Sequence, residues 1–134
     1  MKSVLFSVSL LFLILPSISH AQEKTIVLPI ISEMLPISDD NYISSEDEEK
    51  TVMLKGSRGM INSSHATIVF QEGSIGDITG EDNVLYVSRG ASVSVRGKNN
   101  TVYSEEKSQV NEAGEGTKII KVEKFSVNPK ELVQ

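Results

Sequence analysis

The sequence contains no cysteine and no tryptophan, and aromatic residues make up only 5% of its 134 residues. The absence of cysteine excludes disulfide bonds and thiolate metal ligands. Because few aromatic side chains are present to fill a deep interior, we expect stability to depend on a regular packing of small and aliphatic residues. Basic residues are also outnumbered, with 13 Lys and Arg against 18 Asp and Glu. This acidic balance argues against nucleic acid and anionic membranes as partners.

The N-terminal segment is typical of an export signal. Lys2 precedes an apolar run at residues 4–15, Pro16 follows it, and Ser19 and Ala21 place small residues where a signal peptidase reads them. The run is too short to span a bilayer, which takes about 20 apolar residues. We therefore predict that residues 1–21 are a signal peptide and that the remaining chain is periplasmic or secreted, with no membrane attachment after cleavage.

A 17-residue period extends from about Thr51 to Ser104. When the sequence is aligned at this interval, residues of the same chemical type fall into columns across three copies. These columns include Gly56, Gly73, Gly90; Gly59, Gly76, Val93; Ile61, Ile78, Val95; Ser63, Gly80, Gly97; Ala66, Asn83, Asn100; Ile68, Leu85, Val102; Val69, Tyr86, Tyr103; and Met53, Phe70, Val87. So many matching columns indicate a structural repeat.

Each copy contains two short strand patterns separated by turns. Apolar residues alternate at 66, 68 and 70, a charged residue with Gly73 follows, and small or apolar residues alternate again at 74, 76 and 78. Gly80 begins the second turn, since glycine tolerates positive φ. The pattern predicts an all-β fold, a small parallel β-solenoid with two short strands per 17-residue coil and about three coils. An antiparallel β-meander or sandwich is the alternative.

Stacked coils place equivalent residues above one another, about 4.8 Å apart. We expect Ile78 to pack between Ile61 and Val95. We also expect a structural ladder in which the side-chain amides of Asn83 and Asn100 form hydrogen bonds along the stack. The glycines that the same ladder requires at its corners are Gly73, Gly80, Gly90 and Gly97.

The flanking segments are assigned to caps and connections. Residues 22–50 are expected to form an N-terminal capping strand at 25–31, interrupted by Pro29, followed by an acidic linker from Ser38. These acidic residues could bind calcium, but their spacing lacks the EF-hand pattern, which favours a solvated linker; calcium binding is left open. Residues 105–134 are expected to form a loop and a C-terminal capping strand at 118–127. The repeat domain itself is assigned to residues 51–104.

The sequence offers little support for catalysis. His65 follows Ser64, but no G-x-S-x-G motif is present, and Asp82 and Asn99 occupy the equivalent positions of the next copies, as expected for turn residues. One histidine beyond the signal segment and no cysteine do not make a zinc site. We predict that the protein is not an enzyme and has no catalytic residues, cofactor or metal site.

Tyr86 and Tyr103 are the candidate partner surface. If they point outward on adjacent coils, they form an aromatic strip suited to a sugar ring or a protein. The alternative is that both rings only cover the sheet or pack under the C-terminal strand.

The stretches "ITGEDNVLYV" and "VRGKNNTVYSEE" resemble the G-x-x-N-x-V-Y repeats of a family of small exported bacterial proteins. The resemblance covers about Gly73 to Tyr103. It is carried by Gly80, Asn83, Gly97, Asn100, Val102 and Tyr103. It implies a β-helix-like domain of unknown function and no activity. A looser similarity links the two-strand coil to curli-type amyloid subunits.

Together these features predict an exported, non-enzymatic β-repeat protein that acts as a binding or structural module in the cell envelope. The expected partner is an envelope protein or a glycan, and a homo-oligomer is left open. The alternative function is a self-assembling, curli-like fibre subunit.

Overall fold

Two layers of parallel strands make up the fold. The computed structural model describes residues 23–132, so the predicted signal peptide lies outside the described residues. The strands are β1 (Glu23–Val27), β2 (Leu35–Ile37), β3 (Tyr42–Ser44), β4 (Lys50–Met53), β5 (Arg58–Asn62), β6 (Thr67–Phe70), β7 (Ile75–Glu81), β8 (Val84–Val87), β9 (Ser92–Lys98), β10 (Thr101–Glu105), β11 (Gln109–Glu115) and β12 (Lys118–Ser126). The described residues also include two short 3-10 helices, η2 (Ile31–Glu33) and η3 (Pro129–Leu132).

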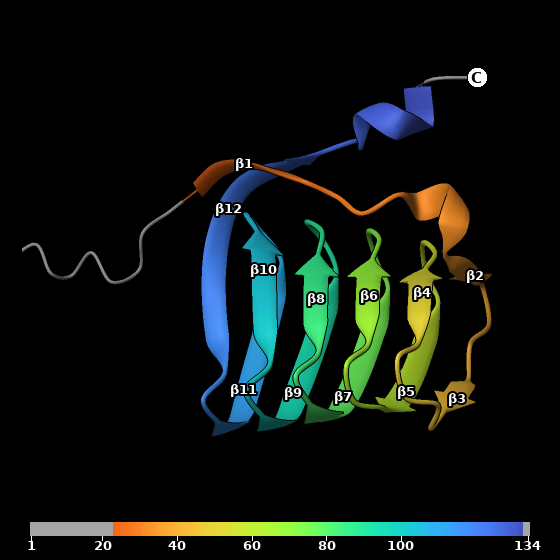
Figure 1. Ribbon diagram of the computed structural model, residues 1–134, viewed down its shortest axis with the longest axis vertical. Helices are drawn as coiled ribbons and strands as arrows, with labels where there is room; N and C mark the ends of the chain where they lie inside the picture. Colours follow the sequence, from red (N-terminus) through yellow and green to blue (C-terminus); the bar gives the residue numbers. More distant parts are fainter. Residues whose placement is uncertain (1–22, 133–134) are drawn as a thin grey trace, which may run out of the picture.

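The chain alternates between the two sheets as it winds (Figure 1). Sheet A has the order β1-β12-β10-β8-β6-β4-β2, and sheet B has the order β11-β9-β7-β5-β3. All recorded strand pairs are parallel. The predicted parallel β-solenoid is therefore confirmed, with about five turns instead of about three, and the antiparallel alternative is not favoured.

The 17-residue register continues beyond the predicted repeat on both sides. Tyr42 pairs with Gly59 inside the segment that we expected to be a linker, and Gln109 pairs with Ser92 in the segment expected to be a loop. The sequence conceals these coils because their inward positions carry polar residues, which removes the apolar period while the backbone period persists. The 17-residue register is broken only where the chain enters the stack, because Leu35 in β2 pairs with Thr51, 16 residues later.

Equivalent side chains form files through the interior. Ile61, Ile78 and Val95 are register partners and are each no more than 1% exposed. Ile68, Leu85 and Val102 form a second file in sheet A. Both files belong to one hydrophobic cluster, as the predicted stacking requires.

Large residues of sheet A face small residues of sheet B. An added Cβ on Gly76 would lie 2.3 Å from the Phe70 ring, and one on Gly59 would lie 2.9 Å from the Met53 methyl group. One coil later the pair is Val87 with Val93, so the large residue has become smaller and the small one larger. The sum of the two side-chain sizes keeps the sheets at one spacing.

Close backbone contact explains the second glycine column. Gly80 and Gly97 have φ of 135° and 122°, and a Cβ on either would lie 1.9 Å from the carbonyl oxygen of the residue one coil earlier. Only glycine fits there, because both the backbone conformation and the space exclude a side chain.

The turns that lead from sheet A to sheet B contain a small buried residue, and the winding ends where a large residue takes its place. The Ser57 and Ser74 hydroxyls donate to the Leu54 and Gln71 carbonyls at 2.7 and 2.6 Å. Ser108 makes the same contact to Glu105 at 2.6 Å. The next position at this interval is Phe125, whose ring is too large for a corner that buries a serine. The chain therefore continues in β12 without turning back into sheet B.

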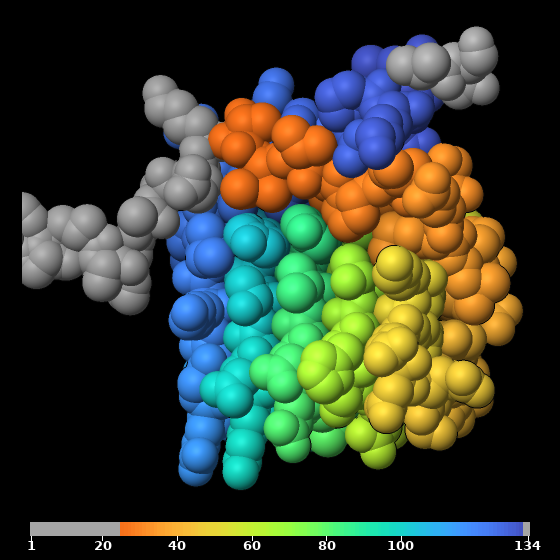
Figure 2. Space-filling model, in the orientation of Figure 1, coloured from red at the N-terminus to blue at the C-terminus, as the bar shows by residue number. Residues whose placement is uncertain are grey.

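The N-terminal segment lies along the outside of the stack (Figures 1 and 2). β1 pairs with β12 in parallel, and the chain then crosses sheet A to enter the stack at β2, at the opposite end. Met34 packs with Val52 and Val69 in a second cluster, joined by Leu28 and Ile31. The N-terminal strand predicted at 25–31 is thus found at Glu23–Val27, and the C-terminal strand predicted at 118–127 at Lys118–Ser126.

Candidate functional site

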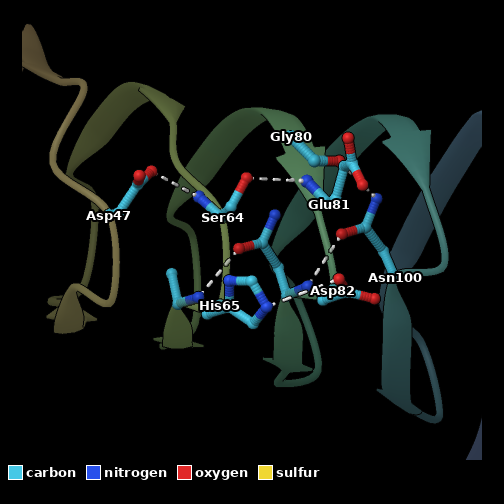
Figure 3. Close-up of polar contacts among 9 residues, drawn as sticks. Asp47, Ser64, His65, Gly80, Glu81, Asp82 and Asn100 are labelled. Atoms are coloured by element: carbon cyan, nitrogen blue, oxygen red, sulfur yellow. Dashed lines mark hydrogen bonds and ion pairs between the residues drawn. The ribbon is translucent and has the colours of Figure 1, made fainter.

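The corner around His65 contains the histidine and serine considered as a hydrolase pair (Figure 3). His65 Nε2 lies 3.5 Å from Asp82 Oδ2, with both side chains exposed. Ser64 Oγ accepts a hydrogen bond from the Glu81 amide at 3.3 Å, and the Ser64 amide donates to Asp47 at 3.0 Å. Within residues 23–132, no hydrogen bond joins Ser64 to His65. The contacts are those of stacked turn residues.

The φ angles explain why these residues lie at this corner. His65, Asp82 and Asn99 have φ of 60°, 57° and 56°, and Gly116 follows at 73°. Asn and Asp adopt this left-handed region more readily than most residues with a side chain. The predicted interpretation of His65 as one member of a turn column agrees with this geometry.

The structural ladder contains the predicted residues but uses different bonds. Asn100 Oδ1 accepts the backbone N–H of Asn83 at 3.0 Å, and Asn83 Oδ1 accepts that of Ala66 at 2.9 Å. Asn100 Nδ2 donates to the Gly80 carbonyl at 3.2 Å. Each amide side chain therefore satisfies backbone groups of the preceding coils, instead of pairing with another amide. The role is structural.

A buried carboxylate begins the same column in the first coil. Glu49 is 9% exposed and accepts hydrogen bonds from the hydroxyls of Tyr42 (2.9 Å), Ser44 (2.5 Å) and Thr51 (2.6 Å). Burial is the largest effect on the pKa of Tyr42 and raises it. The hydrogen bond with Ser44 lowers this pKa, and the interactions with Glu49 raise it. Sequence reasoning placed Glu49 in a solvated linker, and its spacing of 17 residues from Ala66 was the signal that could have identified it.

Clusters suited to a metal ion are not found in the part of the chain that the structure describes. No group of three or more His, Cys, Asp or Glu side chains there is arranged to hold one. Glu49 is held by hydroxyl groups, which act as donors and leave its carboxylate inside the first coil.

Tyr86 and Tyr103 lie together on the outer face of sheet A. Their ring centroids are 5.1 Å apart with an interplanar angle of 17°, and Phe125 meets Tyr86 edge-on at 5.9 Å. Tyr86 also packs against the cluster of Met34 and Val52 under the N-terminal segment. Burial, with a smaller contribution from Tyr103, raises the pKa of Tyr86. Both rings are half-buried, and they cover the sheet as well as facing outward.

The outer face of sheet B carries an apolar patch that sequence reasoning missed. Ile43, Met60 and Ile75, here named the sheet B patch, are 68%, 55% and 41% exposed. Ile43 and Met60 are register partners. Two shallow depressions of about 270 and 240 Å³ are both lined by Met60 and Asp77. The signal was available, because these residues occupy the outward positions of their strands.

A second surface lies at the C-terminal end of the stack, between β11 and β12. A groove of about 320 Å³ is lined by Ser104, Ser108, Val110, Ile119 and Lys121. Val110 and Ile119 are only partly buried and pack against the end of the main cluster. The interior of the solenoid is thus accessible at this end.

Residues 23–132 include no helix with the length and apolar character needed to cross a membrane. Comparison with protein-family models finds no match to this chain. No curated protein and no solved structure matches it either. The resemblance to the exported G-x-x-N-x-V-Y family therefore stays a prediction from the repeat residues.

Proposed function

We propose that the chain is an exported, non-enzymatic β-solenoid that serves as a binding module in the cell envelope and contacts a protein through the sheet B patch. Export rests on the signal-like pattern of residues 1–21. The absence of an assembled nucleophile and base at His65, within the described residues, is consistent with a role other than catalysis.

The exposure of the sheet B patch carries the proposal. Sheet A has its outward apolar residues Val52 and Val69 covered by the N-terminal segment, at 1% exposure each. Ile43 and Met60 on sheet B have no such cover in the described part of the chain. Exposed, adjacent apolar side chains on a rigid sheet are a feature of protein interaction sites.

The surroundings of the patch favour a protein over a glycan. The Arg96 guanidinium donates to Asp77 at 2.7 Å beside the patch, which supplies a charged rim to an apolar centre. Glycan sites use free aromatic faces, whereas Tyr86 and Tyr103 stack on each other and Phe125 meets the edge of their stack. We therefore place the tyrosines second to the sheet B patch as a partner surface.

Site-specific photo-crosslinking in envelope preparations tests this proposal. A photoreactive residue at Met60 should capture a defined partner. The same residue at Val127, an exposed apolar control that directly follows β12 of sheet A, should not. The purified partner should then bind the wild-type protein and lose affinity for a variant with Ile43→Ser and Met60→Ser, while Tyr86→Ser with Tyr103→Ser keeps it. Equal capture at both positions, or loss only with the tyrosine variant, would contradict the proposed surface.

Self-assembly into a fibre is the second candidate, supported by the uncovered edge of β11 in sheet B. Two charged residues oppose it, because Glu112 and Lys121 occupy inward columns at the end where another coil would stack. Incubation of the mature protein at high concentration, followed by sedimentation and amyloid-dye fluorescence, decides between the two. A monomeric, dye-negative sample is expected.

A further inference from the structure

The two sheets of the stack differ in length by one strand. In sheet A the winding strands are β2, β4, β6, β8, β10 and β12, and β1 joins only at the edge. Sheet B contains β3, β5, β7, β9 and β11. β12 extends the stack beyond β10, but within residues 23–132 no strand follows β11 in sheet B. The last coil is therefore half complete, with one strand position unfilled beside β11.

Residues 23–132 do not fill this position themselves. At the 17-residue interval, residues 126–132 would lie along β11, with Pro129 next to Glu112. Proline has no N–H to donate to a neighbouring strand. Phe125 also prevents the corner from closing, and its N–H instead donates to Glu105 at 2.8 Å. Residues after β12 form η3 away from the stack (Figure 1).

The free edge of β11 has an identifiable set of backbone groups. The Gln109 amide donates to Ala91, and the Glu115 carbonyl accepts from Asn99, so these odd-numbered positions face the preceding coil. Successive residues of a strand direct their backbone groups to opposite sides, so Val110, Glu112 and Gly114 present theirs to the empty position.

Side chains around the empty position define a preference. Val110 and Ile119 line the groove of about 320 Å³ next to the edge. Glu112 is exposed, points toward the interior column of Val95, and has no recorded partner among residues 23–132. The position therefore offers an apolar pocket and, two residues further along, an unpaired carboxylate.

We propose that the free edge of β11 binds one extended segment of another polypeptide as the missing strand of sheet B, parallel to β11. The segment carries an apolar side chain above Val110, in the groove beside Ile119, and a basic side chain above Glu112. Main-chain hydrogen bonds supply affinity and the two side chains supply selectivity, as in other complexes formed by strand addition. This site is separate from the sheet B patch on β3, β5 and β7.

A single strand fits this position better than a second copy of the chain. If β3 of another copy paired with β11, its β2 would have to occupy the place already taken by β12. If its β2 paired at the end of sheet A instead, the position beside β11 would stay empty. Antiparallel pairing of two β11 edges would bring the acidic side chains of Glu112 and Glu115 from both copies together, which is unfavourable.

Peptide binding measured by fluorescence anisotropy tests the proposal on the full mature protein. The probes are a short peptide of alternating valine and threonine with one central lysine, and the same peptide with glutamate in place of lysine. The wild-type protein should prefer the lysine peptide by about tenfold, because the lysine makes one charged contact with Glu112 at a partly shielded edge. Glu112→Lys should reverse the preference, and Glu106→Lys, the matched charge change outside β11, should leave it unchanged.

A backbone variant separates strand addition from simple charge attraction. Glu112→Gln removes the charge but keeps the outward N–H, so it should retain binding and lose only the lysine preference. Glu112→Pro removes the carboxylate and the outward N–H together, and it should bind both peptides about tenfold more weakly than Glu112→Gln does. The proposal is overturned if the wild-type protein binds neither peptide, or if Glu112→Lys keeps the original preference. It is also overturned if sedimentation detects a dimer that Glu112→Lys abolishes, since the occupant is then a second copy.

Discussion

The inner coils and the two terminal coils share one backbone register but obey different rules for their side chains. The file of Ile61, Ile78 and Val95 begins at Ser44 in the first coil and ends at Glu112 in the last. Inner positions are covered above and below, so a polar group there would lose its hydration without compensation. Terminal positions have a neighbour on one side only, and they accept polar and charged residues.

The difference also limits growth. Inward-facing charges on edge strands are one way in which natural proteins prevent further strands from adding indiscriminately. Here Glu112 ends one interior file at the C-terminal end, and Glu49, satisfied by three hydroxyl donors, begins another at the N-terminal end. The same carboxylates that interrupt the repeat pattern in the sequence therefore mark where the stack stops.

The largest expected effect contrasts one glycine inside the stack with its equivalent at the end. Gly97→Ala should lower the free energy of unfolding by about 4 kcal/mol or more, because its Cβ meets the Gly80 carbonyl and φ is 122°. Gly114→Ala should cost only about 1 kcal/mol, since β11 can move away from Gly97. Urea denaturation of both variants measures this difference, and equal losses would contradict the contrast between interior and end.

The pairing of large with small residues can be tested by exchange between neighbouring coils. Gly76→Val should cost about 3 kcal/mol through overlap with the Phe70 ring. Combining it with Phe70→Val reproduces the Val87 and Val93 pair of the next coil and should recover part of that loss. Thermal and urea unfolding of the single and double variants give the coupling energy. Strictly additive losses would show that the two positions do not share one space.

The smallest contrast concerns the asparagine ladder. Asn100→Ala should cost about 2 kcal/mol, because it leaves the buried N–H of Asn83 without its acceptor. Thr117, the next residue of that column, has a buried hydroxyl with no hydrogen-bond partner in the described structure. Thr117→Ala should change stability by no more than about 0.5 kcal/mol. A large loss with Thr117→Ala would indicate that the ladder continues into the last coil.

The sequence predicts the inner coils well because stacking demands the same residue type on each coil. The parallel solenoid, the file through Ile78 and the corner position of His65 all follow from the 17-residue columns. The terminal coils could not be predicted from hydrophobicity, since Ser44 and Glu112 occupy inward positions. The sheet B patch was missed because its column lacks a common chemical type. Met60 is in register with Ile43 on one side and Asp77 on the other, so the 17-residue alignment does not mark this position as apolar.

Some contacts are beyond any local pattern. The pairing of β1 with β12 joins Glu23 to Val122, and no periodicity connects two segments so far apart. Asn100 forms hydrogen bonds with the Asn83 N–H and the Gly80 carbonyl. These bonds depend on how its side chain is oriented inside the turn, which the amino-acid types alone do not define. Sequence columns thus identify which residues stack, and coordinates are needed to see what each one touches.

The closure of β1 on β12 has a consequence for the order of folding. Contacts within the stack connect residues 17 positions apart, so each coil can form on the one before it as soon as both are available. The pairing of β1 with β12 can form only after β12 is available. The Asn128 side chain reinforces this pairing by donating a hydrogen bond to the Leu28 carbonyl, 100 residues away in the sequence. β1 is therefore among the last of the described strands to pair, and until it does the edge of β12 in sheet A stays open to other chains.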